Sequence, residues 1–434
     1  MNQQAILERG QKARSAGIKL SALSAAAIAQ ALEAIAQALD HQREAIKKAN
    51  QQDYQRSLDE DLAAPLLKRL TFDDHKIDDV IAGIHSLIRL KSPIGQTKMA
   101  TELDEGLDLY RVTCPIGVIG IVFESRPDAF VQISTLCLKS GNAVMLKGGR
   151  EALETNRMLY EIIADATDKA GIPQGWIQNL ESREEVSDML TLDQYIDLII
   201  PRGSNAFVRY IMDHTSIPVM GHADGLCHVY IDAKADPQKA VPIAVDSKAQ
   251  YVAVCNAAET LLIHKDAAAA ILPELEAALK KAGVALRGDE RVRQLIHADA
   301  ATDADWETEY LDYVLSIKIV DSLAEAINHI NHYGSGHTDV IVTEDEDAAR
   351  QFTTLVDSAD VFVNCSSRFA DGFRFGFGAE VGISTSKLHA RGPVGLDGLV
   401  SYKYKLIGHG QIVADYADGT RKFTHNPLDS SCPL

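Results

Sequence analysis

The sequence has no pair of closely spaced cysteines. Its six cysteines stand at positions 114, 137, 227, 255, 365 and 432, and none belongs to a Cys-x-x-Cys motif. Such spacing argues against a disulfide scaffold and favours a reducing compartment. Residues 1–17 also lack the apolar core of a signal peptide. We therefore expect a cytoplasmic protein.

Long apolar runs and an excess of positive charge are missing as well. The most apolar run, residues 20–39, is interrupted by Gln30, Glu33 and Gln37, so we interpret it as an amphipathic helix and not as a membrane span. The formal net charge is −18, and a surface of that sign repels phosphate backbones and anionic lipid. We expect no nucleic-acid partner and no membrane association, and an anionic substrate would need a local positive pocket.

Several catalytic signatures are absent. No Gly-x-Gly-x-x-Gly follows a strand, and the nearest match, residues 376–382, is one residue too long and lies late in the chain. The sequence contains no Walker A, Gly-x-Ser-x-Gly or His-Glu-x-x-His motif. His329, His332 and His337 have no carboxylate or cysteine at zinc-ligand spacing. We therefore predict neither a standard Rossmann fingerprint nor a metal site.

What is present is an alternation of strand and helix patterns. The 434 residues are 46% hydrophobic, which suffices for two or three domains. Residues 1–91 are predicted to be helical, and from about residue 104 short apolar strands alternate with helices, which indicates an α/β fold with parallel sheets. The tail, residues 399–412, is predicted to pair with residues 107–112 as a protruding ribbon. Further strands are predicted at residues 118–123, 143–146, 196–200, 229–232, 260–264, 314–320, 339–343 and 361–364.

Three stretches are candidates for chemistry. Lys147-Gly-Gly-Arg150 follows a predicted buried strand, at the edge where open α/β sheets bind ligands. An ordinary turn with solvated charges is the alternative. A second glycine turn, at Gly203 and Ser204, opens a helix that the serine side chain is placed to cap. Helix N-termini favour anions, although a plain capped turn explains this pattern equally. Cys255 is one of six cysteines, and composition does not select it.

Longer stretches of the sequence resemble a known family. Residues 115–127 (PIGVIGIVFESRP) and 138–149 (LKSGNAVMLKGG) are similar to the cofactor half of the aldehyde-dehydrogenase superfamily. The similarity runs over essentially the whole chain. It narrows to the γ-glutamyl phosphate reductase family through residues 221–228, 248–260, 320–341 and 375–393.

This resemblance implies an aldehyde-dehydrogenase-like α/β fold, with two Rossmann-like α/β domains and a small β-ribbon oligomerisation domain. The cofactor-binding domain would comprise residues 1–103 and 116–228, and the catalytic domain residues 229–396. The ribbon and the C-terminal tail would comprise residues 104–115 and 397–434. A ribbon that pairs between subunits implies a homodimer or a homotetramer.

The resemblance also implies a reaction. It is the NADPH-dependent reduction of L-glutamyl 5-phosphate to L-glutamate 5-semialdehyde with release of phosphate, the second step of proline biosynthesis from glutamate. Cys255 falls where the family carries its nucleophile, so the reaction would run through a Cys255 thioester. Functional coupling to glutamate 5-kinase stays open. Two alternative interpretations also stay open. The chain could be an aldehyde-oxidising or CoA-acylating relative, or it could be an inactive scaffold.

Two positions bear on this reaction. Hydrolytic aldehyde dehydrogenases carry a glutamate base before the nucleophile strand, whereas the corresponding residues 220–225 contain no glutamate. A thioester would then survive for reduction, although His222 and Asp224 are alternative bases. Arg150 stands where NAD-using relatives often carry an acidic residue, and a guanidinium pairs with a 2′-phosphate. We therefore predict NADPH as the cofactor.

The predicted site extends beyond Cys255. The backbone N–H of Cys255 and Ser125 are the candidate oxyanion donors, and Asn256 is placed with them as catalytic. Guanidinium groups suit substrate anions, and Arg391 is a further candidate, although about half of the candidate arginines are expected to form structural ion pairs. The predicted cofactor-binding residues are Lys147, Gly148, Arg150, Gly203 and Ser204, and the predicted substrate-binding residues are Arg126, Asp224, Arg368, Arg374, Ser384 and Thr385.

Overall fold

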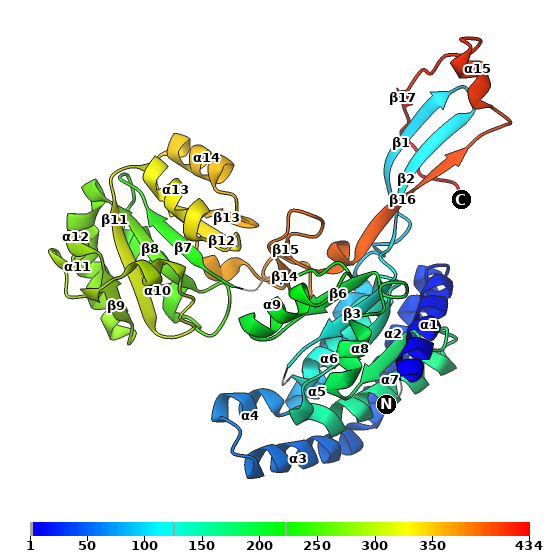
Figure 1. Ribbon diagram of the computed structural model, residues 1–434, viewed down its shortest axis with the longest axis horizontal. Coiled ribbons are helices and arrows are strands. Elements are labelled where there is room, and N and C mark those ends of the chain that lie inside the picture. The colour runs from blue at the N-terminus through cyan, green and yellow to red at the C-terminus, as the bar shows by residue number, and fades with distance from the viewer. Residues whose placement is uncertain (1–2, 125, 222–223) are drawn as a thin grey trace.

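The computed structural model describes residues 3–124, 126–221 and 224–434 and has three parts (Figure 1). One part combines the N-terminal helices with a small sheet. A second α/β part lies beside it, and a slender sheet protrudes from the first part. Among the described residues, no helix is both long enough and apolar enough to cross a membrane.

Five helices open the chain, as predicted for residues 1–91. Side-chain caps explain two of the helix starts, because Ser24 accepts a hydrogen bond from the Ala27 N–H and Asp73 accepts one from the Lys76 N–H. The amphipathic helix predicted over residues 20–39 corresponds to α2, which begins only at Ala25 because the chain turns at the Ser24 cap. The helices are α1 (Gln3–Leu20), α2 (Ala25–His41), α3 (Arg43–Asp59), α4 (Ala64–Leu70) and α5 (Asp74–Arg89).

The first α/β unit is built on a parallel four-stranded sheet of order β5-β4-β3-β6. Apolar residues of α1, α2 and α5 share one continuous core with these strands. The strands are β3 (Val118–Val122), β4 (Ala143–Lys147), β5 (Ile177–Leu180) and β6 (Leu198–Pro201). The helices are α6 (Pro127–Lys139), α7 (Leu153–Lys169), α8 (Arg183–Met189) and α9 (Asn205–Asp213), with a 3-10 turn at Arg150–Ala152.

The second α/β unit has a parallel seven-stranded sheet of order β10-β9-β11-β8-β7-β12-β13. Two apolar cores form around the sheet, one with α10 and α11 and one with α13 and α14. The strands are β7 (Cys227–Ile231), β8 (Ala258–His264), β9 (Ala285–Gly288), β10 (Asp299–Ala300), β11 (Val314–Val320), β12 (Thr338–Val342) and β13 (Asp360–Val363). The helices are α10 (Pro237–Ala249), α11 (Lys265–Lys281), α12 (Glu290–Arg293), α13 (Leu323–Tyr333) and α14 (Glu346–Leu355), with 3-10 turns at Asp303–Glu307 and Ser367–Phe369.

The protruding sheet is antiparallel, with the order β16-β2-β1-β17 (Figure 1). The predicted pairing of the tail with residues 107–112 is confirmed, because β16 pairs with β2 along its length. The predicted start of the ribbon at residue 104 is wrong, since the preceding strand already pairs with β2. The strands are β1 (Thr97–Asp104), β2 (Leu107–Pro115), β16 (Val400–Ile407) and β17 (Asn426–Pro427), with α15 (Val413–Ala417) near the tip. The connection to the second unit carries the small pair β14 (Ile383–Ser384) and β15 (Gly392–Pro393) and a 3-10 turn at Leu396–Leu399.

Candidate active site

Cys255 lies in the loop that joins α10 to β8. Its Sγ is 3.2 Å from the Nε2 of His337, which directly precedes β12. Gly225 packs against the same loop, and a Cβ at that position would lie 2.4 Å from the Cys255 carbonyl oxygen and 2.5 Å from its Cα. A side chain at residue 225 would therefore displace the cysteine.

The site forms at the amino ends of three adjacent parallel strands. Cys227 begins β7, Cys255 precedes β8 and His337 precedes β12, and β7 lies between the other two strands. Cys227 donates its thiol proton to the Cys255 carbonyl oxygen at 3.1 Å, and its Sγ is 3.7 Å from His337 Nδ1. The sheet thus brings together residues that are distant in sequence.

The Cys255 thiol is held in its neutral form. Burial is the main cause that raises the pKa of Cys255 to about 12, and the charges of Glu309 and Glu380 raise it further. The backbone N–H of Cys255 and the Arg202 guanidinium act in the opposite direction and stabilise a thiolate. The same N–H was predicted as an oxyanion donor, and that role stays a prediction.

His337 is itself held by a chain of buried polar groups. Its Nδ1 is 2.8 Å from Thr338 Oγ1, and the Thr338 hydroxyl donates to Asp360 Oδ2 at 3.4 Å. All three residues are buried. Burial raises the pKa of Asp360 to about 6. In the sequence His337 stood out only as a candidate metal ligand, because 82 residues separate it from Cys255.

Two arginines supply positive charge near the thiol. Arg202, which follows β6, and Arg368 both interact electrostatically with Cys255, and burial lowers the pKa of both guanidinium groups. Arg368 also donates from Nε to Gln250 Oε1 at 3.0 Å. Arg368 was predicted as a substrate residue, whereas Arg202 was not, because a turn residue gives no sign of its burial. Arg374 lies next to Arg368 and donates to its carbonyl oxygen at 2.5 Å.

Other predicted substrate residues make contacts within the protein. Arg126 forms an ion pair with Asp128 at 3.0 Å, and Arg391 donates to the Asp357 carboxylate at 3.2 Å and to its carbonyl oxygen at 3.0 Å. Asp224 accepts from Arg209 at 3.1 Å and from Asn205 at 3.0 Å. Ser384 is fully buried in β14, where its Oγ accepts from the Ser386 N–H at 3.3 Å, and Thr385 follows it at partial exposure.

Asn256 and Ser125 are the two remaining catalytic candidates. The side-chain amide of Asn256 donates to the Ala370 carbonyl oxygen at 2.7 Å, and its backbone carbonyl accepts from Ser367 at 2.6 Å. Asn256 therefore ties the Cys255 loop to the segment that carries Arg368, and a catalytic role for it stays a prediction. Ser125 and His222 lie outside the described residues.

The carboxyl end of β4 forms a tight turn around the predicted cofactor residues. Burial lowers the pKa of Lys147, the last residue of β4. A Cβ on Gly148 would lie 2.0 Å from Asn156 Nδ2, and one on Gly149 would lie 1.8 Å from Glu151 Oε1. The buried Oδ1 of Asn156 has no hydrogen-bond partner among the described residues. A glycine turn with a free buried acceptor fits a ribose hydroxyl, so the described residues are compatible with a dinucleotide.

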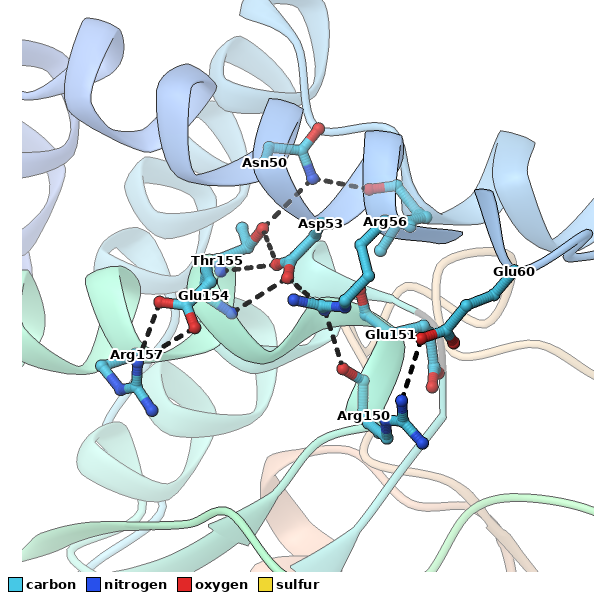
Figure 2. A network of polar contacts seen from close by, with 10 residues as sticks. Asn50, Asp53, Arg56, Glu60, Arg150, Glu151, Glu154, Thr155 and Arg157 are labelled. Carbon is cyan, nitrogen blue, oxygen red and sulfur yellow. Dashed lines mark hydrogen bonds and ion pairs between the residues drawn. The ribbon is translucent and has the colours of Figure 1, made fainter. Parts of the chain in front are cut away.

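Helix α3 fixes this turn from outside (Figure 2). Asp53 accepts hydrogen bonds from the backbone N–H groups of Glu154 and Thr155 at the start of α7, at 3.1 and 2.7 Å, and forms an ion pair with Arg56 at 2.5 Å. Arg56 in turn donates to the Arg150 carbonyl oxygen at 3.1 Å. The Arg150 side chain reaches Glu60 at 2.9 Å and is exposed.

The second predicted anion site, at the start of α9, differs in detail from the prediction. Ser204 is the N-cap residue, but its side chain makes no capping hydrogen bond, so the predicted serine cap is wrong. The backbone N–H of Ser204 bonds to the Glu124 carboxylate instead, and burial raises the pKa of that carboxyl. A Cβ on Gly203 would lie 3.0 Å from Glu124 Oε1. Glu124 therefore stands at the position where an anion was expected.

Comparison with known proteins gives independent evidence for the family of this chain. The sequence profile of the aldehyde dehydrogenase family matches residues 1–305. A γ-glutamyl phosphate reductase of Acetivibrio thermocellus is 62% identical over 429 residues, which cover 99% of this chain and 100% of the relative. The chain belongs to the γ-glutamyl phosphate reductases of the aldehyde dehydrogenase family. It is an oxidoreductase of the aldehyde-dehydrogenase type, as the sequence resemblance implied.

Solved structures agree with this assignment. The crystal structure of a γ-glutamyl phosphate reductase from Thermotoga maritima matches with a TM-score of 0.92 at 39% identity, covering 94% of this chain and 99% of that chain. An acetylating aldehyde dehydrogenase from Geobacillus thermoglucosidasius, at 16% identity and a TM-score of 0.64, covers 94% of this chain and 98% of its own and shares the fold. The predicted aldehyde-dehydrogenase-like α/β fold is confirmed.

Proposed function

We propose that the protein reduces L-glutamyl 5-phosphate to L-glutamate 5-semialdehyde with NADPH and releases phosphate, as the second step of proline biosynthesis. The observation that carries this proposal is the partly buried thiol of Cys255, which packs against Gly225 and interacts electrostatically with Arg202 and Arg368. The names of relatives that match nearly the whole chain support the same reaction. We place the enzyme in the cytoplasm as a homodimer or homotetramer, with coupling to glutamate 5-kinase open.

The first half of the reaction forms an acyl-enzyme. The Cys255 sulfur attacks the acyl carbon, and the bond from that carbon to the phosphate oxygen breaks. The positive charges of Arg202 and Arg368 stabilise the negatively charged phosphate of the substrate, because guanidinium groups bind such oxyanions strongly. The backbone N–H of Cys255 donates to the oxyanion of the tetrahedral intermediate.

The second half is a reduction. Lys147, Gly148, Arg150, Gly203 and Ser204 are the residues that would hold the cofactor, which supplies a hydride for the thioester carbon. The carbon–sulfur bond of the resulting hemithioacetal then breaks, which releases the aldehyde and returns the sulfur of Cys255. No glutamate stands in residues 220–225 to activate water, so the thioester persists until it is reduced.

The reverse reaction tests the proposal most directly. Purified protein is mixed with L-glutamate 5-semialdehyde, NADP and phosphate, and NADPH formation is followed by absorbance, with phosphate-free and arsenate controls. We expect a strictly phosphate-dependent signal that is lost in Cys255→Ala and kept in the matched variant Cys365→Ala. Turnover with CoA or water in place of phosphate would contradict the substrate assignment, and full activity of Cys255→Ala would contradict the nucleophile.

A further inference from the structure

The Cys255 thiol needs a base to become a nucleophile. The thiolate and not the thiol attacks carbonyl carbons, and burial between carboxylates holds Cys255 in the thiol form. The charged and titratable groups that face the sulfur come from several elements: Glu309 before β11, Glu380 before β14, Arg202 after β6, Arg368 in the 3-10 turn and Cys227 in β7.

The carboxylates near the sulfur are engaged elsewhere. Glu309 accepts a hydrogen bond from Asn205 Nδ2 at 2.6 Å, and Glu380 accepts one from the Gly372 N–H at 2.8 Å. His337 differs from them, because its Nε2 makes the 3.2 Å contact with Cys255 Sγ. An imidazole at this distance can take the proton directly.

The hydrogen-bond chain behind His337 selects the useful tautomer. A hydroxyl group has one proton to donate, and the Thr338 hydroxyl donates it to Asp360. The Thr338 oxygen must therefore accept from Nδ1–H of His337, to which it lies at 2.8 Å. In this tautomer Nε2 carries a lone pair that faces the Cys255 sulfur. Near Cys227, the Asp339 carboxylate lies 2.9 Å from His228 Nδ1.

We propose that His337 is the catalytic base of this enzyme and that Thr338 and Asp360 are positioning residues that fix its tautomer. The inference rests on the proposed thioester reaction. His337 Nε2 takes the thiol proton as the sulfur–carbon bond forms, and passes it to the departing phosphate as the carbon–oxygen bond breaks. After hydride reduction expels the Cys255 thiolate, one proton from solvent returns to the sulfur through His337. Each turnover thus consumes one hydride and one proton.

Alkylation of Cys255 by iodoacetamide tests the base without any substrate. The rate is followed by mass spectrometry of the Cys255 peptide over a range of pH in the wild type, in His337→Gln and in the matched control His332→Gln, which changes an exposed histidine of α13. We expect His337→Gln to slow alkylation near neutral pH by about tenfold or more and to move its pH profile upward. The control should follow the wild type.

Turnover gives a second readout. In the phosphate-dependent reverse assay, His337→Gln should lower kcat by about 10²- to 10⁴-fold and leave the KM for phosphate nearly unchanged. Wild-type alkylation kinetics in a folded His337→Gln variant would show that His337 is not the base. A wild-type enzyme that shows no phosphate-dependent turnover, but whose alkylation still depends on His337, would refute the proposed reaction and leave the base in place.

A milder variant covers the case in which His337→Gln does not fold. Thr338→Val keeps the shape of the side chain and removes the hydroxyl that fixes the tautomer. We expect alkylation to slow in the same direction as in His337→Gln, but by a smaller factor. An unchanged rate and pH profile in Thr338→Val would overturn the positioning role.

Discussion

At the scale of single residues, Gly225 sets the position of Cys255, the proposed nucleophile. A Cβ at Gly225 would lie 2.4 to 2.6 Å from atoms of Cys255, whereas a Cβ at the nearby Gly221 meets Pro201 only at 3.6 Å or more. We expect Gly225→Ala to lower kcat/KM by about 100-fold, since small displacements of a reacting group cost that much. Gly221→Ala should retain activity. Steady-state kinetics of both variants test this prediction. A fully active Gly225→Ala would show that the Cys255 loop can move without a loss of activity.

Arg202 is the arginine whose role the sequence did not reveal. Its charge lowers the pKa of the Cys255 thiol, and we expect the guanidinium group to attract the substrate phosphate. In Arg202→Gln we expect the KM for phosphate to rise by about tenfold in the reverse assay and alkylation of Cys255 to slow. Arg209→Gln is the control, because Arg209 is exposed and pairs with Asp224. Equal KM values for phosphate in Arg202→Gln and wild type would show that Arg202 does not bind the phosphate.

Asp360 should make stability depend on pH. Burial raises the pKa of Asp360 in the folded protein to about 6, from its ordinary value of 3.8. Because the folded state favours the neutral carboxyl, this contribution is fully present below the unfolded pKa and is lost as pH rises through about 6. Relative to Asp360→Asn, the wild type should lose up to about 3 kcal/mol of unfolding free energy between pH 4 and 7. Denaturant unfolding of both proteins measures this, and parallel pH profiles would contradict it.

The sequence led to Cys255, the proposed nucleophile, but not to all of the residues that lie around it. Cys255 was singled out by the stretch that surrounds it, and Arg368 by its charge. His337 was missed because its position depends on which strand ends are adjacent in the folded sheet, and the strand order β8-β7-β12 cannot be derived from the alternating pattern alone. Arg202 was missed because it follows β6 of the other sheet, and the sequence does not show that this strand end lies near Cys255.

At the scale of elements, one buried carboxylate joins α3 to α7 (Figure 2). Asp53 is fully buried, caps the start of α7 and pairs with Arg56. We expect Asp53→Ala to lower the unfolding free energy by about 3 kcal/mol, because it removes a helix cap and leaves the guanidinium without its partner. Glu60→Gln in the same region should change little, since the Glu60 to Arg150 pair is exposed. Denaturant unfolding compares the two, and equal stabilities would contradict the capping role.

Many of the strands that the sequence predicted are apolar and buried. The predicted strand over residues 314–320 coincides with β11, most of which is buried. Several strands were missed, and for two of them, β1 and β9, the physical reason is clear. In β1 the residues are polar and partly exposed, so no apolar alternation marks them, and β9 has only four residues, two of them buried. Tertiary pairing, and not local pattern, makes these segments strands.

At the scale of the whole molecule, the protruding sheet exposes apolar side chains. Tyr402 and Tyr404 of β16 are 54% and 56% exposed, and Leu406 is 56% exposed. Such a patch on a thin ribbon is typical of a subunit interface. We expect Tyr404→Lys combined with Leu406→Lys to shift the protein from an oligomer toward monomers in light scattering. An unchanged mass would place the interface elsewhere.

The pairing of β16 with β2 has a consequence for synthesis of the chain. The two strands pair from Val400 opposite Pro115 to Ile407 opposite Asp108, and the whole seven-stranded unit is translated between them. During translation, β1 and β2 therefore emerge from the ribosome as a hairpin whose outer edge has no strand beside it until the last part of the chain appears. Domains that emerge early fold early, so both α/β units can be complete before the ribbon closes. An assembly of subunits through this ribbon would therefore wait until β16 has been made.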